Sequence, residues 1–419
     1  MPTDSKPTFR EAARFWVKLG CIGFGGPAGQ IAIMHRELVE RRRWIAEGDF
    51  SKALDFCMLL PGPEAQQLAT WLGWRLHGTK GGIAAGALFV LPAAFLLLAL
   101  SWLFMAGGHL PWLADVFRGL AAAVVALVFE AVPRLGRRAL KSSLHWGLAV
   151  ASFLALQIFN APFVGILAVA GLVGWLSNRS HPPVSFEKLP STPWRETLAT
   201  AGVCLALWWA PVLGVAAWLG WESVPARMGL FFSQAAVVTF GGAYAVLPYV
   251  AQQAVETHGW LSSSQMISGL ALAETTPGPL IMVLQFVGFV GGWQNPGTLS
   301  PATAAVLCAV LTTWVTFLPS FLFIFAGGPH VQKLTALPWL SGALSGITAA
   351  VVGVVLNLAV DFTRHALWPG GGSMDWFVGV LALAAFFTLR KFHSALVPVI
   401  VLCGLAGWLG GVLGFLPVR

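Results

Sequence analysis

Leu60-Pro61-Gly62-Pro63 decides the fold, because Thr276-Pro277-Gly278-Pro279 repeats its core 216 positions later in an equally apolar segment. A helix does not continue through Pro-Gly-Pro. The first proline lacks an N–H and disfavours helical angles at the residue before it, and the glycine adopts backbone angles that are closed to other residues. The second proline suits the first turn of a new helix. Each copy therefore predicts a helix end followed by a helix start, with free N–H groups pointing to the break.

The composition predicts an all-α polytopic membrane protein embedded in the lipid bilayer. Of the 419 residues, 57% are hydrophobic and only 10% are charged, against roughly 25% charged in soluble domains. Uncharged runs such as 82–105 and 302–325 reach the roughly 20 residues that a helix needs to cross a bilayer. The net charge of +8 comes from basic residues in short loops between such runs. This pattern indicates positive-inside orientation and no nucleic-acid partner.

Motifs for cofactors, metals and catalysis are not found in the sequence. The five cysteines stand singly, without a CxxC or His-spaced partner, so we interpret them as small buried hydrophobic residues. The chain has no phosphate-binding loop and no protease pattern. We therefore expect no cofactor, no metal and no enzymatic activity, and an energy source other than ATP bound by this chain.

The chain contains two copies of one unit. At an offset of 216, Phe24-Gly25-Gly26 aligns with Phe240-Gly241-Gly242, as the two Pro-Gly-Pro motifs align with each other. An insertion at 291–298 raises the offset to 227, where Arg137-Arg138-Ala139-Leu140 aligns with Arg364-His365-Ala366-Leu367. The predicted domains are a first repeat at 1–176, a polar linker at 177–197, a linking transmembrane helix at 198–220 and a second repeat at 221–419. Each repeat has about six membrane segments.

The basic residues predict that the second copy is inverted. The loop 35–52 holds five Lys and Arg residues, and its counterpart 251–268 holds none. By the positive-inside rule the first loop is cytoplasmic and the second lies outside, an inversion that a single linking helix produces. The N-terminus is then cytoplasmic and the C-terminus periplasmic. Basic residues flank the segments 15–34 and 53–74 at both ends, and all of these residues are expected to be cytoplasmic. Each segment is therefore predicted to be a re-entrant hairpin, and a tilted full span is the alternative.

The Gly-Gly motifs, Phe24-Gly25-Gly26-Pro27 and Phe240-Gly241-Gly242-Ala243-Tyr244, predict a second pair of helix breaks. If all four breaks converge, their helix N-termini direct N–H groups and positive dipole ends at one volume near the membrane midplane, which suits an anion. Broken helices in paired repeats are recurrent in secondary transporters. Gly-Gly in an apolar helix is also compatible with simple close packing of helices.

Polar residues beside the breaks are costly in lipid and are expected to face a cavity or a partner. We expect Lys18 to supply charge to an oxyanion, and Thr275 and Thr276 to donate hydrogen bonds with backbone N–H groups. Glu64 and Glu274 are proton-coupling candidates, because an apolar environment favours the neutral carboxyl group; structurally paired carboxylates are the alternative. The full expected substrate-binding set is Lys18, Gly25, Gly26, Pro27, Pro61, Gly62, Pro63, Gly241, Gly242, Tyr244, Thr275, Thr276, Pro277, Gly278 and Pro279.

Two other charged positions lie further from the breaks. Glu130 stands four residues before Arg134 and is expected to pair with it rather than to act as a relay. Arg118 precedes a long apolar run near the expected outer face. It suits either lipid anchoring or the initial attraction of an anion.

The motifs Lys18-Leu19-Gly20, Gly23-Phe24-Gly25-Gly26-Pro27, Leu60-Pro61-Gly62-Pro63-Glu64 and Ala273-Glu274-Thr275-Thr276-Pro277-Gly278-Pro279 resemble those of the chromate ion transporter family. The resemblance is to its long two-domain members and covers nearly the whole chain. It implies two oppositely oriented halves in the bacterial inner membrane. It also implies chromate efflux, driven by the membrane potential or the proton gradient, with sulfate as an isosteric competitor and chromate resistance as the result.

The resemblance has two departures: the second copy has Ala243 where the first has Pro27, and Leu280 where the first has Glu64. The residues themselves predict a transporter for an oxyanion-sized anion. An oxyanion channel, a transporter of sulfate or another anion, and an intramembrane enzyme or scaffold are the alternatives. The sequence leaves a homodimer open.

Overall fold

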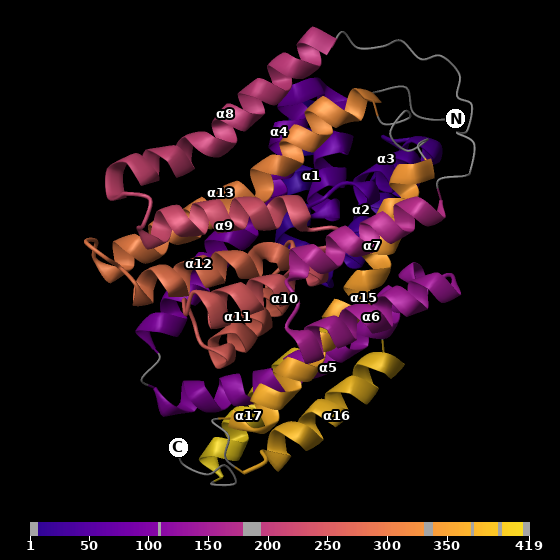
Figure 1. Ribbon diagram of the computed structural model, residues 1–419. Helices are drawn as coiled ribbons and strands as arrows, with labels where there is room; N and C mark the ends of the chain where they lie inside the picture. The colour runs from indigo at the N-terminus through magenta and orange to yellow at the C-terminus, as the bar shows by residue number, and fades with distance from the viewer. Residues whose placement is uncertain are drawn as a thin grey trace.

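A computed structural model describes residues 7–107, 110–178, 194–330, 338–369, 373–392 and 396–413. Within these ranges the regular elements are all helices, and none is a strand (Figure 1). The predicted all-α class is therefore confirmed. The described residues include five helices that are long and apolar enough to cross a membrane: Glu64–Ala106, Trp112–Ala139, Trp194–Leu219, Pro301–His330 and Trp339–Leu367.

The first half begins with short helices and continues with long ones. Its elements are α1 (Phe9–Ile22), α2 (Gly26–His35), the π-helical turn η1 (Arg36–Arg41), α3 (Glu47–Leu59), α4 (Glu64–Ala106), α5 (Pro111–Ala139), α6 (Ser143–Phe159) and α7 (Phe163–Ser177). The long α4 folds back on itself, because His77 and Gly78 have non-helical backbone angles. Its two arms pack so closely that a Cβ on Gly73 would overlap the side chain of Ala85. The short helices α1, α2 and α3, at about 1.5 Å per residue, are too short to cross ~30 Å of hydrocarbon alone.

The helix α8 (Trp194–Leu219) precedes the second half and contains most of the predicted linking helix. Most of the predicted linker, 179–193, lies outside the described residues. The second half comprises α9 (Val224–Val238), α10 (Ala243–Ala251), η2 (Gln252–Thr257), α11 (Ser263–Thr275), η3 (Leu280–Met282), α12 (Val283–Gln294), α13 (Pro301–Leu322), η4 (Phe323–Gly327), η5 (Gly328–His330), α15 (Pro338–Leu367), α16 (Trp376–Lys391) and α17 (Leu396–Val412).

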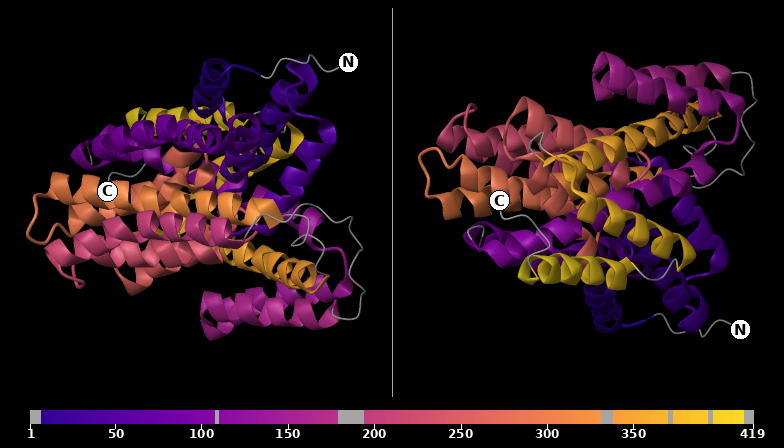
Figure 2. Two further views of the ribbon diagram at one scale, coloured as in Figure 1. Left: turned by 90° about the horizontal axis from the view of Figure 1, so that it is seen from above. Right: turned by 90° about the horizontal axis from the view of Figure 1, so that it is seen from below.

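The two halves pack reciprocally through their last helices. Helix α5 of the first half packs against α16 and α17, and α15 of the second half packs against α6 and α7. Figure 2 shows the C-terminal helices, in yellow, beside the purple helices of the first half. The helices approach closely at glycines: a Cβ added to Gly353 would overlap the carbonyl oxygen of Ala149, and one added to Gly119 would overlap that of Cys403. Each half therefore buries its helices against the other.

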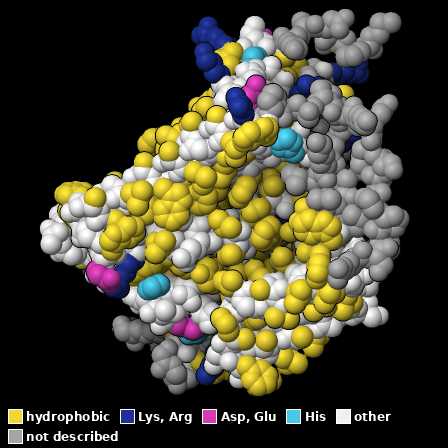
Figure 3. Space-filling model, turned by 45° about the horizontal axis from the view of Figure 1, so that its top comes forward, with side chains coloured by type: hydrophobic (Ala, Val, Ile, Leu, Met, Phe, Trp, Pro, Cys, Tyr) yellow, Lys and Arg dark blue, Asp and Glu magenta, His cyan; other side chains and the backbone are white. Residues whose placement is uncertain are grey.

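The outer surface is apolar. Figure 3 shows hydrophobic side chains over most of one face, with most of the visible Lys and Arg side chains near one end. Large side chains such as Trp218 of α8 and Phe387 of α16 are each 65% exposed. Such a surface suits contact with acyl chains, where exposed hydrophobic side chains carry no penalty from water. This agrees with the predicted polytopic membrane class.

Candidate functional site

All four expected helix breaks are present. They lie between α1 and α2, between α3 and α4, between α9 and α10, and between α11 and η3. Each contains a glycine with positive φ: Gly25 at 89°, Gly62 at 115°, Gly241 at 83° and Gly278 at 109°. Residues with side chains rarely adopt these angles, so glycine is required at each break.

The breaks meet in pairs, and each pair joins the two halves. The N–H of Gly62 donates to the carbonyl oxygen of Thr239 at 2.7 Å, and the N–H of Gly278 donates to that of Gly23 at 3.1 Å. Both the donors and the acceptors of these bonds are 216 positions apart. Each Pro-Gly-Pro segment is thus bonded to the Gly-Gly break of the other half.

Two buried glutamines reinforce the breaks. Gln30 of α2 donates from Nε2 to the carbonyl oxygens of Gly23, at 2.9 Å, and Gly278, at 2.6 Å. Gln67 of α4 donates from Nε2 to the carbonyl oxygen of Pro61 at 2.7 Å. These bonds satisfy backbone acceptors that the broken helices leave free. The sequence shows both residues as polar neighbours of the motifs, but it does not show that Gln30 bridges the two halves.

Glu64, the first residue of α4, turns its carboxylate toward the start of α10. A Cβ added to Gly242 would lie 2.9 Å from Oε1 of Glu64. The other oxygen, Oε2, is buried and has no hydrogen-bond partner in the described part of the chain. Because α10 begins at Ala243, the carboxylate lies at the positive end of this helix, where negative charge is favoured. One of the four helix starts therefore already faces a carboxyl group of the protein.

The start of α2, which corresponds to that of α10, is open instead. A Cβ added to Gly26 would meet no atom within 4 Å. Gly25, Gly26 and Pro27 are all partly buried. No side chain therefore occupies the space beside Gly26, in contrast to Glu64 beside Gly242.

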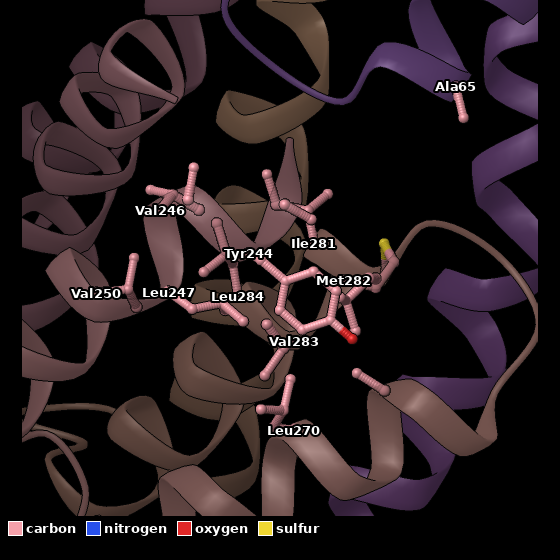
Figure 4. Packing of buried hydrophobic residues seen from close by; sticks show 14 of the residues in the cluster. Ala65, Tyr244, Val246, Leu247, Val250, Leu270, Ile281, Met282, Val283 and Leu284 are labelled. Atoms are coloured by element: carbon pink, nitrogen blue, oxygen red, sulfur yellow. The ribbon is translucent and has the colours of Figure 1, made fainter. Parts of the chain in front are cut away.

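Tyr244 and Glu274 form a buried pair between α10 and α11. The Tyr244 hydroxyl donates to Oε1 of Glu274, and the two residues are 9% and 5% exposed. Figure 4 shows Tyr244 among Met282, Val283 and Leu270. The Arg134 guanidinium lies 6.0 Å from the centre of the Tyr244 ring and forms an ion pair with Glu130 at 3.2 Å. The expected Glu130–Arg134 pair is confirmed, and Glu274 has a structural partner.

The remaining expected residues are placed less favourably for binding. Lys18 is exposed on α1. The hydroxyl of Thr275 donates to the carbonyl oxygen of Leu272 at 2.8 Å, and that of Thr276 donates to Ala273 at 3.0 Å. Their protons are therefore engaged at the end of α11, and their oxygens remain as acceptors. Pro61, Pro63, Pro277 and Pro279 flank the breaks, where they supply no N–H.

Arg118 has a role that its sequence position does not indicate. Its Nε and a terminal nitrogen both lie 2.6 Å from Oδ2 of Asp375, which is 6% exposed. The pair joins α5 to the start of α16, where Asp375 also accepts from the N–H of Val378. Arg118 therefore holds the two halves together, in place of the lipid anchoring or anion attraction expected from the sequence.

A cavity of about 380 Å³ lies among α6, α10, η2, α11 and α15. Its polar lining includes Gln252, Glu256, Asn357, Asp361 and Arg364. It adjoins α10 and α11, the helices that carry Tyr244 and Glu274. The described residues contain no cluster of His, Cys, Asp and Glu that could hold a metal ion.

Comparison with known proteins gives consistent matches over nearly the whole chain. A family model described as "Chromate transporter" matches residues 10–175 and 226–408. A chromate transport protein from Pseudomonas aeruginosa is 36% identical over 405 residues, which cover 95% of this chain and 91% of that protein. One from Cupriavidus metallidurans is 29% identical, with coverage of 94% and 91%. A probable chromate transport protein from Synechococcus elongatus is also 29% identical, with coverage of 96% and 95%. No solved structure matches the chain.

Proposed function

This chain belongs to the chromate transporter family, and we propose that it is a secondary transporter that exports chromate across the bacterial inner membrane. The observation that carries the proposal is the pairing of helix breaks across the two halves, through Gly62 with Thr239 and Gly278 with Gly23. Paired broken helices place helix starts and irregular backbone inside the protein, where they can face a small anion rather than lipid.

The proposed mechanism is alternating access by two inverted repeats. The reciprocal bonds between breaks support it, as does the reciprocal packing of α5 with α16 and α17 and of α15 with α6 and α7. Because each break is bonded to the other half, a movement of one half against the other shifts both pairs together. The basic loop 35–52 then faces the cytoplasm and the loop 251–268 faces out.

The membrane potential is sufficient to drive export. A divalent oxyanion that leaves a cell with a negative interior gains about 2.3 kcal/mol per charge per 100 mV. Proton coupling through Glu64 or Glu274 is needed only for export against a steep gradient or for uptake. Sulfate has the same tetrahedral shape and charge and therefore competes. Chromate resistance follows from the removal of chromate from the cytoplasm.

Chromate flux in reconstituted vesicles tests this function, with the membrane potential and the pH gradient set independently. We expect flux that saturates with chromate concentration, follows the potential and is reduced by sulfate, with protein-free vesicles as the control. A current that rises linearly with concentration indicates a channel instead. The absence of chromate and sulfate flux under every gradient contradicts the proposal.

Cysteine labelling from outside tests the inverted topology. Cys21 is exposed and the other four cysteines are buried, so Cys21→Ser is the starting background. A cysteine at Ser263 should react with an impermeant reagent, and one at Arg42 should not. Equal labelling of the two positions shows that the halves are not inverted.

A further inference from the structure

Buried polar atoms without partners gather on α4 and α13. Gln66 has neither amide atom bonded, and Thr316 and Ser320 have free hydroxyl groups, when all described residues are considered. These three residues are 0%, 2% and 1% exposed. The same holds for Oε1 of Gln67, Nε1 of Trp71 and the hydroxyl of Thr312. Buried polar groups in proteins nearly always have a partner, so such a group calls for a bound molecule or ion.

The hydroxyl groups of α13 lead to one helix break. Thr312, Thr316 and Ser320 are spaced by four residues and therefore share one face of the helix. At one end, the Thr312 hydroxyl oxygen lies against Gly288 of α12. At the other end, a Cβ added to Gly62 would lie 3.3 Å from Oγ of Ser320 and 2.9 Å from Nε2 of Gln67. We call Gly62, Gln67 and Ser320 the polar corner, together with Thr316, one turn from Ser320 on α13, and Gln66, the neighbour of Gln67 on α4.

The corresponding positions of the other copy are apolar. The offset of 227 relates Thr316 and Ser320 to Phe89 and Ala93, and the offset of 216 relates Gln66 and Gln67 to Met282 and Val283. All four counterparts are buried hydrophobic residues. The structure places Ala93 against Gly278, as it places Ser320 against Gly62. We call Gly278, Met282, Val283, Phe89 and Ala93 the apolar corner.

We propose that the polar corner binds the transported oxyanion and that the apolar corner binds none. This inference rests on the proposed function and names its binding site. The corner offers two hydroxyl groups and the amide group of Gln66, and the indole N–H of Trp71 lies on the same helix. Neutral donors suit the oxygen atoms of a tetrahedral oxyanion, which accept hydrogen bonds on every side. The polar corner overlaps the substrate-binding residues expected from the sequence only at the Leu60–Pro63 break.

Transport kinetics of hydroxyl-deletion variants test the site, with chromate and sulfate as the probes in reconstituted vesicles. Ser320→Ala and Thr316→Val each remove one donor, and a lost hydrogen bond to a charged ligand lowers affinity about tenfold or more. We expect KM to rise by about that factor for each variant. The matched control is Ser101→Ala, because the Ser101 hydroxyl is equally buried but donates to the carbonyl oxygen of Leu97 at 2.7 Å. Its KM should stay within about twofold of wild type.

Two further variants address folding and the difference between the corners. Ser320→Cys keeps the side-chain shape, with a larger atom that is a much weaker donor, so it should also raise KM if Ser320→Ala does not insert into the membrane. Ala93→Ser adds a hydroxyl to the apolar corner and should leave KM unchanged.

The outcomes separate the inference from the proposed function. If wild-type protein transports chromate and the Ser320 and Thr316 variants keep its KM, the polar corner holds only water and the inference is wrong, although the function stands. A KM increase for Ala93→Ser as large as that for Ser320→Ala contradicts the difference between the corners. If the wild-type protein transports neither anion, the proposed function fails first.

Discussion

The Gln30→Leu substitution tests whether one amide group holds the two halves together at the breaks. Gln30 donates to the carbonyl oxygens of Gly23 and Gly278. The Gly23 oxygen also accepts from the N–H of Gly278, so it keeps one partner. The Gly278 oxygen loses the only donor that the described residues give it. An orphaned buried acceptor costs about 1–3 kcal/mol and the second lost bond about 1 kcal/mol. The sum is a loss of roughly 2–4 kcal/mol in the free energy of unfolding, and leucine has a similar volume, so no cavity adds to it.

Thermal unfolding in detergent, followed by tryptophan fluorescence, measures this loss. A loss of about 1 kcal/mol lowers Tm by roughly 2–4 °C in chains of 150–250 residues and by less in longer ones. With an unfolding entropy of about 2.1 cal/mol/K per residue, we therefore expect Gln30→Leu to lower Tm by about 2–5 °C. Gln234→Leu is the matched control, because Gln234 is exposed on α9 and should change Tm by about 1 °C at most. If Gln30→Leu melts at the wild-type temperature, the amide does not hold the breaks together and the reasoning is refuted.

Three further predictions concern the stability of the fold and are also measured by thermal unfolding. Arg118→Met leaves Asp375 buried without its partner and should lower the free energy of unfolding by about 3–5 kcal/mol. The double variant Arg118→Met and Asp375→Leu should recover most of this loss. Equal Tm values for the single and double variants would contradict the role of the ion pair. Gly278→Ala should destabilise the protein by at least 1–3 kcal/mol, because φ is 109° and the new Cβ would overlap Ala93. Gly202→Ala, where an added Cβ in α8 meets no atom within 4 Å, should be neutral or stabilising by up to about 1 kcal/mol; similar Tm values for these two glycine variants would argue against the break geometry. The Arg41 guanidinium, 2.6 Å from Glu37, lowers the pKa of that carboxyl group, so its contribution is present above the unfolded pKa of about 4.3 and is lost as the pH falls below it. Wild type should therefore be more stable than Glu37→Gln at pH 7, by less than about 1 kcal/mol because Arg41 is exposed. The difference should shrink as the pH falls from about 4 through the lowered pKa of folded Glu37, and a difference of the same size at pH 7 and at about pH 2 would exclude this cause.

The two copies differ in sequence at the polar corner, and this difference lies outside the Pro-Gly-Pro and Gly-Gly motifs. Thr312, Thr316 and Ser320 follow a four-residue spacing, and their counterparts Ala85, Phe89 and Ala93 have lost every hydroxyl. One face of α13 thus carries hydroxyl groups where the aligned face of α4 carries apolar side chains, although both faces are buried. The sequence cannot show that these hydroxyl groups lie without partners, since that depends on every neighbouring helix.

Sequence alone determined the elements that depend on neighbouring residues. The four breaks were predictable because proline lacks an N–H and glycine adopts positive φ wherever it stands. The all-α class followed from uncharged runs of membrane length, and the Glu130–Arg134 pair followed from helical spacing. Each of these properties acts within about one turn or one segment of the chain.

Only the tertiary structure decided which breaks meet and which groups face each other. The bond from Gln30 to Gly278 joins residues 248 positions apart, and the Arg118–Asp375 pair joins residues 257 apart. The contact of Glu64 with Gly242 likewise joins the two halves. No local pattern specifies these partners. A buried donor or charge is satisfied by whatever group the packing of distant helices brings within about 3 Å.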